Sequence, residues 1–233
     1  METWVEWARG PVFRAALAFM ILGLIRHVVL TVVEIRRSVR RAGDKSMPYA
    51  TLAKTTLQWL FPINKVKDRL LYSVTTVSFH VAVIVVPLFL AGHILLWEQA
   101  TGLSWPAIPN LLADVLTIVA VVTAVALVIE RAAARDTRSL SRFGDYAIPL
   151  LIAVPFASGF LVMHPGVNPF PFYVTMFVHV MSANLILVLI PITKLSHIVL
   201  LPSTQLIAET AWHFPPHAGS EVGALLGKEN EPI

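Results

Sequence analysis

Five long runs of apolar residues alternate with polar stretches along the chain. A helix needs about 20 mostly apolar residues to cross the hydrocarbon core of a bilayer. Each run is close to this length or longer, so the pattern predicts an all-α integral membrane protein, a bundle of five transmembrane helices. The predicted spans are Val12–Ile35, Leu70–Trp97, Leu111–Ile129, Tyr146–Met163 and Phe170–Leu201. The second and fifth are longer than a perpendicular helix requires and contain Pro87 and Pro191, so we expect them to tilt and to kink.

Basic residues are concentrated in two of the four loops. The loop from Arg36 to Arg69 holds nine Lys or Arg residues, and the loop after the third span holds Arg131, Arg135, Arg138 and Arg142. The loops 98–110 and 164–169 hold none. We expect a multi-pass protein of a prokaryotic cytoplasmic (inner) membrane. Because cytoplasmic loops carry the excess of Lys and Arg, the two basic loops are expected on the cytoplasmic side. Its N-terminus is then outside, and the basic loop 36–69 and the tail 202–233 are in the cytoplasm.

The role of the basic loops stays open at this stage. They could fix the topology and contact anionic lipid, or they could dock a partner. Apolar side chains spaced among polar ones in Tyr49–Lys65 are typical of a helix that lies in the membrane interface, and the same stretch could contact a partner.

Composition excludes several function classes. Hydrophobic residues make up 56% of the chain and charged residues 14%, whereas a soluble domain has about 25% charged residues. There is no cysteine, so the chain has no iron–sulfur cluster and no thiolate haem ligand of its own. It has no Gly-rich phosphate loop and no nucleophile–base set, and nothing indicates a nucleic-acid partner. Chemistry on a substrate, if any, is expected on another subunit, and catalytic residues are not predicted here.

Four histidines lie inside two of the apolar runs. His80 and His93 share the second run, and His179 and His197 share the fifth. Ionisable side chains inside a membrane are costly and point to function. On a continuous helix, 18 residues are five turns, so His179 and His197 would share one face about 27 Å apart. The predicted topology matches the depth of His93 with His179 outside and of His80 with His197 inside. Two such pairs suggest axial ligands for two haems.

One residue of the inner pair, His80, has an alternative as a haem ligand. On an ideal helix His80 and His93 would point about 140° apart, which is unfavourable for ligands that face one partner helix. His27 in the first run is the runner-up ligand for the inner haem, and Arg26 beside it is a candidate contact of a haem propionate. Any single histidine could instead form a hydrogen bond between helices. We do not expect ligands at His164, His213 and His217, which lie in a loop and the tail.

The stretch from His179 to Ile198 resembles the gamma subunit of respiratory nitrate reductase. That family also has two histidines 18 residues apart, a proline in the second half and a basic residue shortly before the second histidine. The pairs Phe79-His80 and Gly92-His93 are similar to the second span of the family. The resemblance implies five spans, an outside N-terminus and two b haems. It also implies that electrons pass from a membrane quinol, a menaquinol or ubiquinol, to iron–sulfur subunits in the cytoplasm.

The chain departs from nitrate reductase in two respects. The spacing of its second-span histidines is three residues longer, and no lysine stands at the outer end, where the nitrate enzyme has one beside its quinol. The broader family includes membrane cytochrome b subunits of the Hmc, Tmc and Dsr complexes of sulfate reducers and of heterodisulfide reductase. Their cytoplasmic partner resembles an iron–sulfur subunit of heterodisulfide reductase. Their electron donor is a periplasmic multihaem cytochrome c or a quinol. The long basic first loop and the short tail are more similar to this branch.

The resulting expectation is an electron-transfer subunit for anaerobic respiration. Residues 1–201 would form a five-span dihaem cytochrome b domain, and residues 202–233 a cytoplasmic tail. The tail segment with Trp212, Phe214, Pro215 and Pro216 is expected to dock an iron–sulfur subunit, with other membrane subunits possible. One alternative is a quinol-oxidising anchor of a nitrate reductase-like enzyme. The other is a haem-free membrane anchor or transporter.

Overall fold

The structure, a computed structural model, describes residues 1–41, 48–60, 70–204, 206–208 and 217–229. Every regular element in these ranges is a helix, and none is a strand. Within them, five helices are long and apolar enough to cross a membrane. They are Glu2–Arg41, Leu70–Phe89, Asn110–Ala133, Phe143–Met163 and Phe172–Ile192. The predicted all-α fold with five membrane-spanning helices is therefore confirmed, although its boundaries differ from those expected.

The first spanning helix is longer at both ends than the predicted Val12–Ile35. It consists of α1 (Glu2–Trp7), a π-helical turn η1 (Ala8–Val12) and α2 (Phe13–Arg41). Pro11 lies inside η1, and a proline removes one amide donor from a helix. The predicted loop from Arg36 therefore begins as helix and continues so to Arg41.

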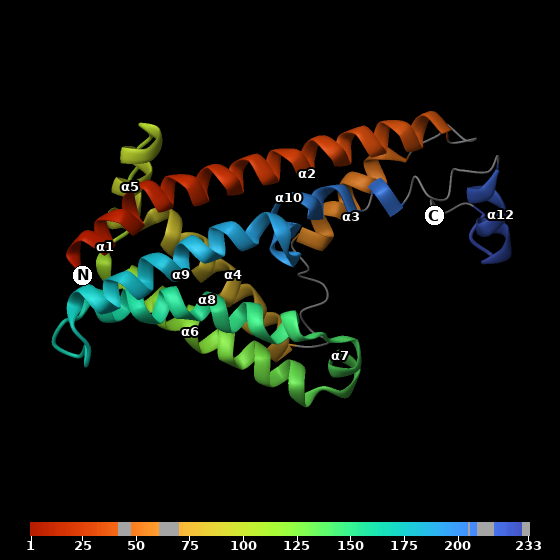
Figure 1. Cartoon of the computed structure of the whole chain (residues 1–233). Coiled ribbons are helices and arrows are strands. Elements are labelled where there is room, and N and C mark those ends of the chain that lie inside the picture. Colours follow the sequence, from red (N-terminus) through yellow and green to blue (C-terminus); the bar gives the residue numbers. More distant parts are fainter. Residues whose placement is uncertain (42–47, 61–69, 205, 209–216, 230–233) are drawn as a thin grey trace. The chain divides into compact units, whose positions relative to one another are not determined.

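The chain forms two compact units. The first comprises residues 1–19 and 66–188. It includes α4 (Leu70–Phe89), α5 (Ala91–Thr101), α6 (Asn110–Ala133), α7 (Arg135–Leu140), α8 (Phe143–Met163) and most of α9 (Phe172–Ile192). In this unit α6 packs against both α4 and α8 (Figure 1). Small side chains on one face of α6, at Ala113, Thr117, Ala120 and Ala124, are buried and allow the helices to approach closely.

The second unit comprises residues 20–65 and 189–233. It includes most of α2, α3 (Tyr49–Leu60), the last turn of α9, η3 (Lys194–Ser196), α10 (His197–Leu200), η4 (Leu201–Ser203) and α12 (Ala218–Leu225). The predicted interfacial stretch is helical as far as Leu60, and α3 contacts η4. Residues 61–65 of that stretch lie outside the described residues, as does the tail segment with Trp212, Phe214, Pro215 and Pro216.

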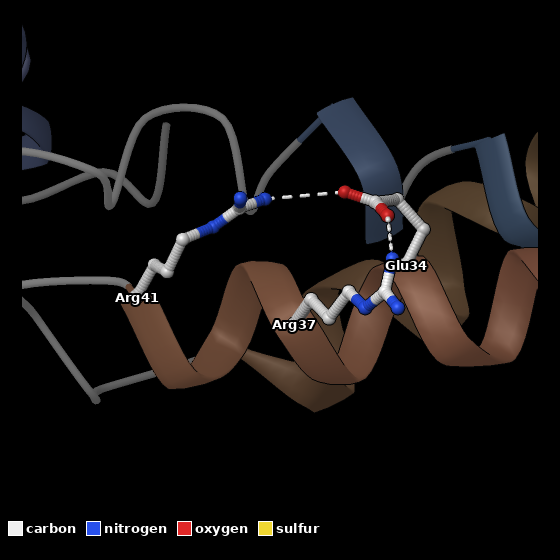
Figure 2. Close-up of polar contacts among 3 residues, drawn as sticks. All are labelled: Glu34, Arg37 and Arg41. Carbon is white, nitrogen blue, oxygen red and sulfur yellow. Dashed lines mark hydrogen bonds and ion pairs between the residues drawn. The ribbon is translucent and has the colours of Figure 1, made fainter.

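Two arginines of the predicted basic loop share one acidic partner on α2. Figure 2 shows Arg37 and Arg41 each reaching one oxygen of the Glu34 carboxylate, with N–O distances of 3.8 and 3.1 Å. All three side chains are more than half exposed, so these ion pairs contribute little to stability. They do reduce the net positive charge that this end of α2 presents.

The predicted second span is not one helix. α4 ends at Phe89, Leu90 has an extended backbone with φ −72° and ψ 130°, and α5 begins at Ala91. α5 then continues in a different direction from α4 (Figure 1). The break follows within one turn of Pro87, which has no amide hydrogen to give to the carbonyl four residues earlier. The expectation of a kinked but continuous helix to Trp97 was wrong, and the 140° angle derived from it does not apply.

The predicted fifth span is also interrupted. α9 ends at Ile192, one residue after Pro191, and Thr193 has an extended backbone with φ −126° and ψ −173°. The short helices η3 and α10 follow. His179 and His197 therefore do not lie on one continuous helix. The continuous helix assumed for them was wrong, so the shared face and the rise of five turns derived from it stay predictions.

Candidate functional site

The break after α4 fixes the position of His93. On a continuous helix, a side chain cannot reach the carbonyl seven residues earlier, because that carbonyl lies about 10 Å away along the axis. Here Leu90 turns the chain, and His93 Nδ1 lies 3.3 Å from the carbonyl oxygen of Val86. Since a carbonyl only accepts hydrogen bonds, Nδ1 carries the hydrogen and Nε2 keeps its lone pair.

The loop after α5 satisfies the other carbonyls at the end of α4. The last carbonyls of a helix have no partner within it, and an unpaired one in a membrane costs several kcal/mol. The Trp105 indole N–H donates to the Leu88 carbonyl at 2.6 Å, and the Ile108 amide donates to the Phe89 carbonyl at 2.9 Å. The break that positions His93 is therefore held by specific hydrogen bonds.

His179 lies on α9 and is held by α8. Its Nδ1 donates to the Pro155 carbonyl at 2.8 Å, which again leaves Nε2 with its lone pair. The ring also lies directly against Gly159, one turn further along α8: a Cβ at this position would come within 2.9 Å of His179 Cε1. Both ring contacts come from the same face of α8, because residues four apart share a face.

The structure brings His93 and His179 together. Their rings are nearly parallel, at 9°, with centroids 5.9 Å apart. Both side chains are only partly exposed. A metal–imidazole bond is about 2.0–2.1 Å, so two rings that share one metal ion have centres about 6 Å apart. The spacing of the ring centres is close to this value, and the backbone acceptors at Nδ1 leave Nε2 of both rings as the nitrogen with a lone pair.

A haem is the metal group that suits this donor set. Among the described residues, no cluster of three or more His, Cys, Asp or Glu side chains could hold a metal ion. A haem iron takes four ligands from the porphyrin and only the axial ones from the protein. Two neutral imidazoles are therefore sufficient for a haem, whereas a structural zinc site needs four protein ligands.

His80 and His197 belong to different units, and their pairing stays a prediction. His80 lies on α4 with Nδ1 2.8 Å from the Thr76 carbonyl, and His197 begins α10 with Nδ1 2.8 Å from the Lys194 carbonyl. Both side chains are exposed on the chain.

His27, the runner-up ligand, uses the opposite ring nitrogen. Its Nε2 lies 2.6 Å from the Pro191 carbonyl, within the second unit. This carbonyl is in the last turn of α9, where the break at Thr193 removes the usual helical donor. His27 therefore caps α9. The adjacent Arg26 is exposed, and nothing in the structure assigns it a propionate.

Some residues near the site escaped sequence reasoning. Gly159 and Trp105 were missed, because contacts across helices leave no signal in spacing. His164, which was not expected to be a ligand, lies 3.4 Å from Asp114 through Nε2, and its ring is 4.2 Å from that of Phe160.

An open cavity of about 270 Å³ lies along α5. His93, Leu96 and Ala100 share one face of this helix, and the last two line the cavity. Polar and aromatic side chains complete the wall: Glu6, Arg9, Arg14, Gln99 and Phe13. The cavity thus combines a carboxylate, amide and guanidinium donors, and an aromatic ring.

Similarity to a bacterial protein identifies the family to which the chain belongs. A protein of Nitratidesulfovibrio vulgaris (strain Hildenborough) is 32% identical over 199 residues, which is 82% of this chain and 85% of the relative. The chain belongs to the same protein family as this relative. The relative's name, "Protein", states no activity. No protein-family model matches the chain, and no solved structure matches it.

Proposed function

We propose that this member of the family is the membrane cytochrome b subunit of a respiratory redox complex. It holds two haem b groups and carries electrons across the membrane. The observation that supports this most is the His93–His179 pair, with parallel rings 5.9 Å apart and both Nδ1 atoms bonded to backbone carbonyls. The resemblance to the nitrate reductase gamma subunit supports the same function.

Each histidine has a distinct role in this proposal. His93 and His179 hold the outer haem, and His80 and His197 hold the inner one. A bound haem supplies an iron that accepts and gives up one electron at a time. The protein supplies the ligands, fixes the ring planes through Nδ1 and keeps water away. Two haems divide the roughly 30 Å of hydrocarbon into shorter electron transfers.

The test is the haem content of the purified protein. A pyridine haemochrome spectrum should give about two b haems per chain. His93→Ala and His179→Ala should each remove one haem, and it should be the same one. A chain that binds no haem when expressed with adequate haem supply would support the alternative of a haem-free anchor or transporter. A single haem would overturn the pairing.

The electron acceptor in this proposal is a cytoplasmic iron–sulfur subunit. The chain has no cysteine, so the next carrier must come from a partner. The predicted cytoplasmic side is basic, although Glu34 offsets part of the charge at Arg37 and Arg41. Truncation after Ser203 should release the partner from the membrane and leave both haems bound. A truncated chain that retains the whole complex would leave only the loops as docking candidates.

The predicted orientation has its own test. A reporter enzyme that needs the periplasm should be active when fused after Trp105 or Gly166, and inactive after Arg41 or Arg138. The reverse pattern would place the His93–His179 pair on the cytoplasmic side.

A quinol, rather than a periplasmic multihaem cytochrome c, is a second candidate for the electron donor. The cavity along α5, on whose wall Leu96 and Ala100 share a helix face with His93, favours it. Oxidation of a quinol releases two electrons and two protons, so a site needs an acceptor for the hydroxyl hydrogens. Glu6 supplies a carboxylate, and Gln99 and Arg14 supply donors for the oxygens.

The cavity can be tested separately from the haems. Glu6→Gln should slow haem reduction by a menaquinol analogue at least tenfold and leave the haem spectra unchanged. Glu2→Gln, on the same short helix but outside the cavity wall, is the matched control. Equal reduction rates in the wild type and Glu6→Gln would favour a cytochrome donor.

A further inference from the structure

The ring of His179 lies against bare backbone at Gly159. A Cβ there would meet Cε1 of the ring at 2.9 Å and Nδ1 at 3.0 Å, which is closer than real Cβ atoms come to their neighbours. By contrast, a Cβ at Gly92, the residue before His93, would have nothing within 4 Å. A side chain at position 159 would therefore force the His179 ring to move, whereas one at position 92 would displace nothing.

Two contacts on α8 together fix the ring. The Pro155 carbonyl takes the Nδ1 hydrogen at 2.8 Å, and Gly159 lets the ring approach the helix closely enough for that bond to form. Because one contact is a directed hydrogen bond and the other is steric, they limit both the tilt and the rotation of the imidazole. The direction of Nε2 follows from these two limits.

We infer that Gly159 is a positioning residue that sets the imidazole plane of His179 against that of His93. This inference rests on the proposed haem function. The nearly parallel rings, at 9°, are the arrangement that this contact permits. Outer partners of a metal-bound histidine orient the ring and tune the metal. A methyl group at position 159 would force the ring away from Pro155 and change its angle to His93.

The experiment compares Gly159→Ala with Gly92→Ala in the purified complex. Haem content, the ferric EPR spectrum and the potential of each haem are measured. Gly159→Ala should either lose one haem of two or keep it with a changed EPR signal, because that signal depends on the angle between the axial ring planes. The haem assigned to His80 and His197 should be unaffected. Gly92→Ala should match the wild type in every measurement.

A double-mutant cycle separates positioning from simple helix packing. In a His179→Ala background the ring is absent, so Gly159→Ala should cause no further loss of folded protein or of the remaining haem. An equal loss in both backgrounds would overturn the inference, since Gly159 would then serve only packing. So would wild-type spectra in the Gly159→Ala single variant. Failure of the proposed function would be visible earlier, as a wild-type protein without haem.

Discussion

The break after α4 and the break after α9 start from a similar sequence signal and end in different arrangements. In each, a proline lies two or three residues before an extended residue, and a histidine follows three or four residues after that residue. After α4, the following His93 turns back and binds a carbonyl of α4 itself. After α9, His197 Nδ1 lies 2.8 Å from the nearby Lys194 carbonyl, and the Pro191 carbonyl is satisfied by His27 from α2.

The difference separates two uses of a membrane histidine. His93 donates through Nδ1, so its Nε2 keeps the lone pair that a metal ligand needs. His27 directs Nε2 to a carbonyl, so the same atom is already committed to the backbone. Position inside the membrane makes both histidines functional candidates. A backbone carbonyl at Nδ1 is compatible with a metal ligand at Nε2, whereas a carbonyl at Nε2 indicates a helix cap. The predictions below test this distinction.

The largest effect is expected from the two candidates for the inner haem. His80→Ala should lose one of two haems, and His27→Ala should keep both, because His27 Nε2 is engaged by the Pro191 carbonyl. His27→Ala should instead lower stability by about 1–3 kcal/mol, the cost of a buried unpaired acceptor. His27→Gln, which keeps a donor, should recover part of this loss. Haem loss in His27→Ala combined with both haems in His80→Ala would reverse the assignment.

Gly23→Ala should be the most destabilising change at the second break. A Cβ at Gly23 would lie 2.4 Å from Pro191 Cβ and 2.9 Å from its Cγ, and the proline ring cannot rotate away. Overpacking of this kind costs about 3 kcal/mol at the upper end of its usual range. Thermal unfolding in detergent measures it. Gly10→Ala, where a Cβ meets nothing within 4 Å, is the control and should be close to the wild type.

These contacts show where sequence reasoning succeeds and where it stops. The five spanning helices followed from apolar run length, because the bilayer imposes that length on any sequence. The breaks in the second and fifth spans could not be predicted in the same way. Pro87 and Pro191 indicate a disturbed helix, but a proline does not determine whether the helix kinks or ends. The approach of the His93 and His179 rings depends on Pro155, which is remote in sequence from both. Contacts between residues that are remote in sequence depend on how the helices pack, so they cannot be predicted from spacing along the chain.

Trp105→Phe tests the first break with a smaller effect. The change keeps an aromatic ring but removes the N–H that donates to the Leu88 carbonyl. Leaving that carbonyl unpaired should cost about 2 kcal/mol and lower the temperature at which the His93 haem is released. Trp4→Phe is the control, because the Trp4 ring packs edge-on against Trp7 in α1 and has no side-chain hydrogen bond among the described residues. Equal shifts in both variants would show that ring size, not the indole N–H, stabilises the break.

Thr193→Val should give the smallest effect, at the second break. The Thr193 hydroxyl donates to the Leu189 carbonyl at 2.7 Å and accepts from the Leu195 amide at 3.3 Å. It thus closes α9 and caps η3 in the manner of an N-cap, so its loss should cost about 1 kcal/mol. Thr193→Ser keeps the hydroxyl and should be nearly neutral.

A second control lies inside an unbroken helix. The Thr123 hydroxyl donates to the Val119 carbonyl at 2.6 Å in the middle of α6, where backbone amides already satisfy the carbonyls. Thr123→Val should therefore change stability less than Thr193→Val does, although both remove one hydroxyl from a membrane helix. If the two variants lose the same stability, the hydroxyl at Thr193 does not act as a cap, and His27 at the Pro191 carbonyl is the cap that remains at this end of α9.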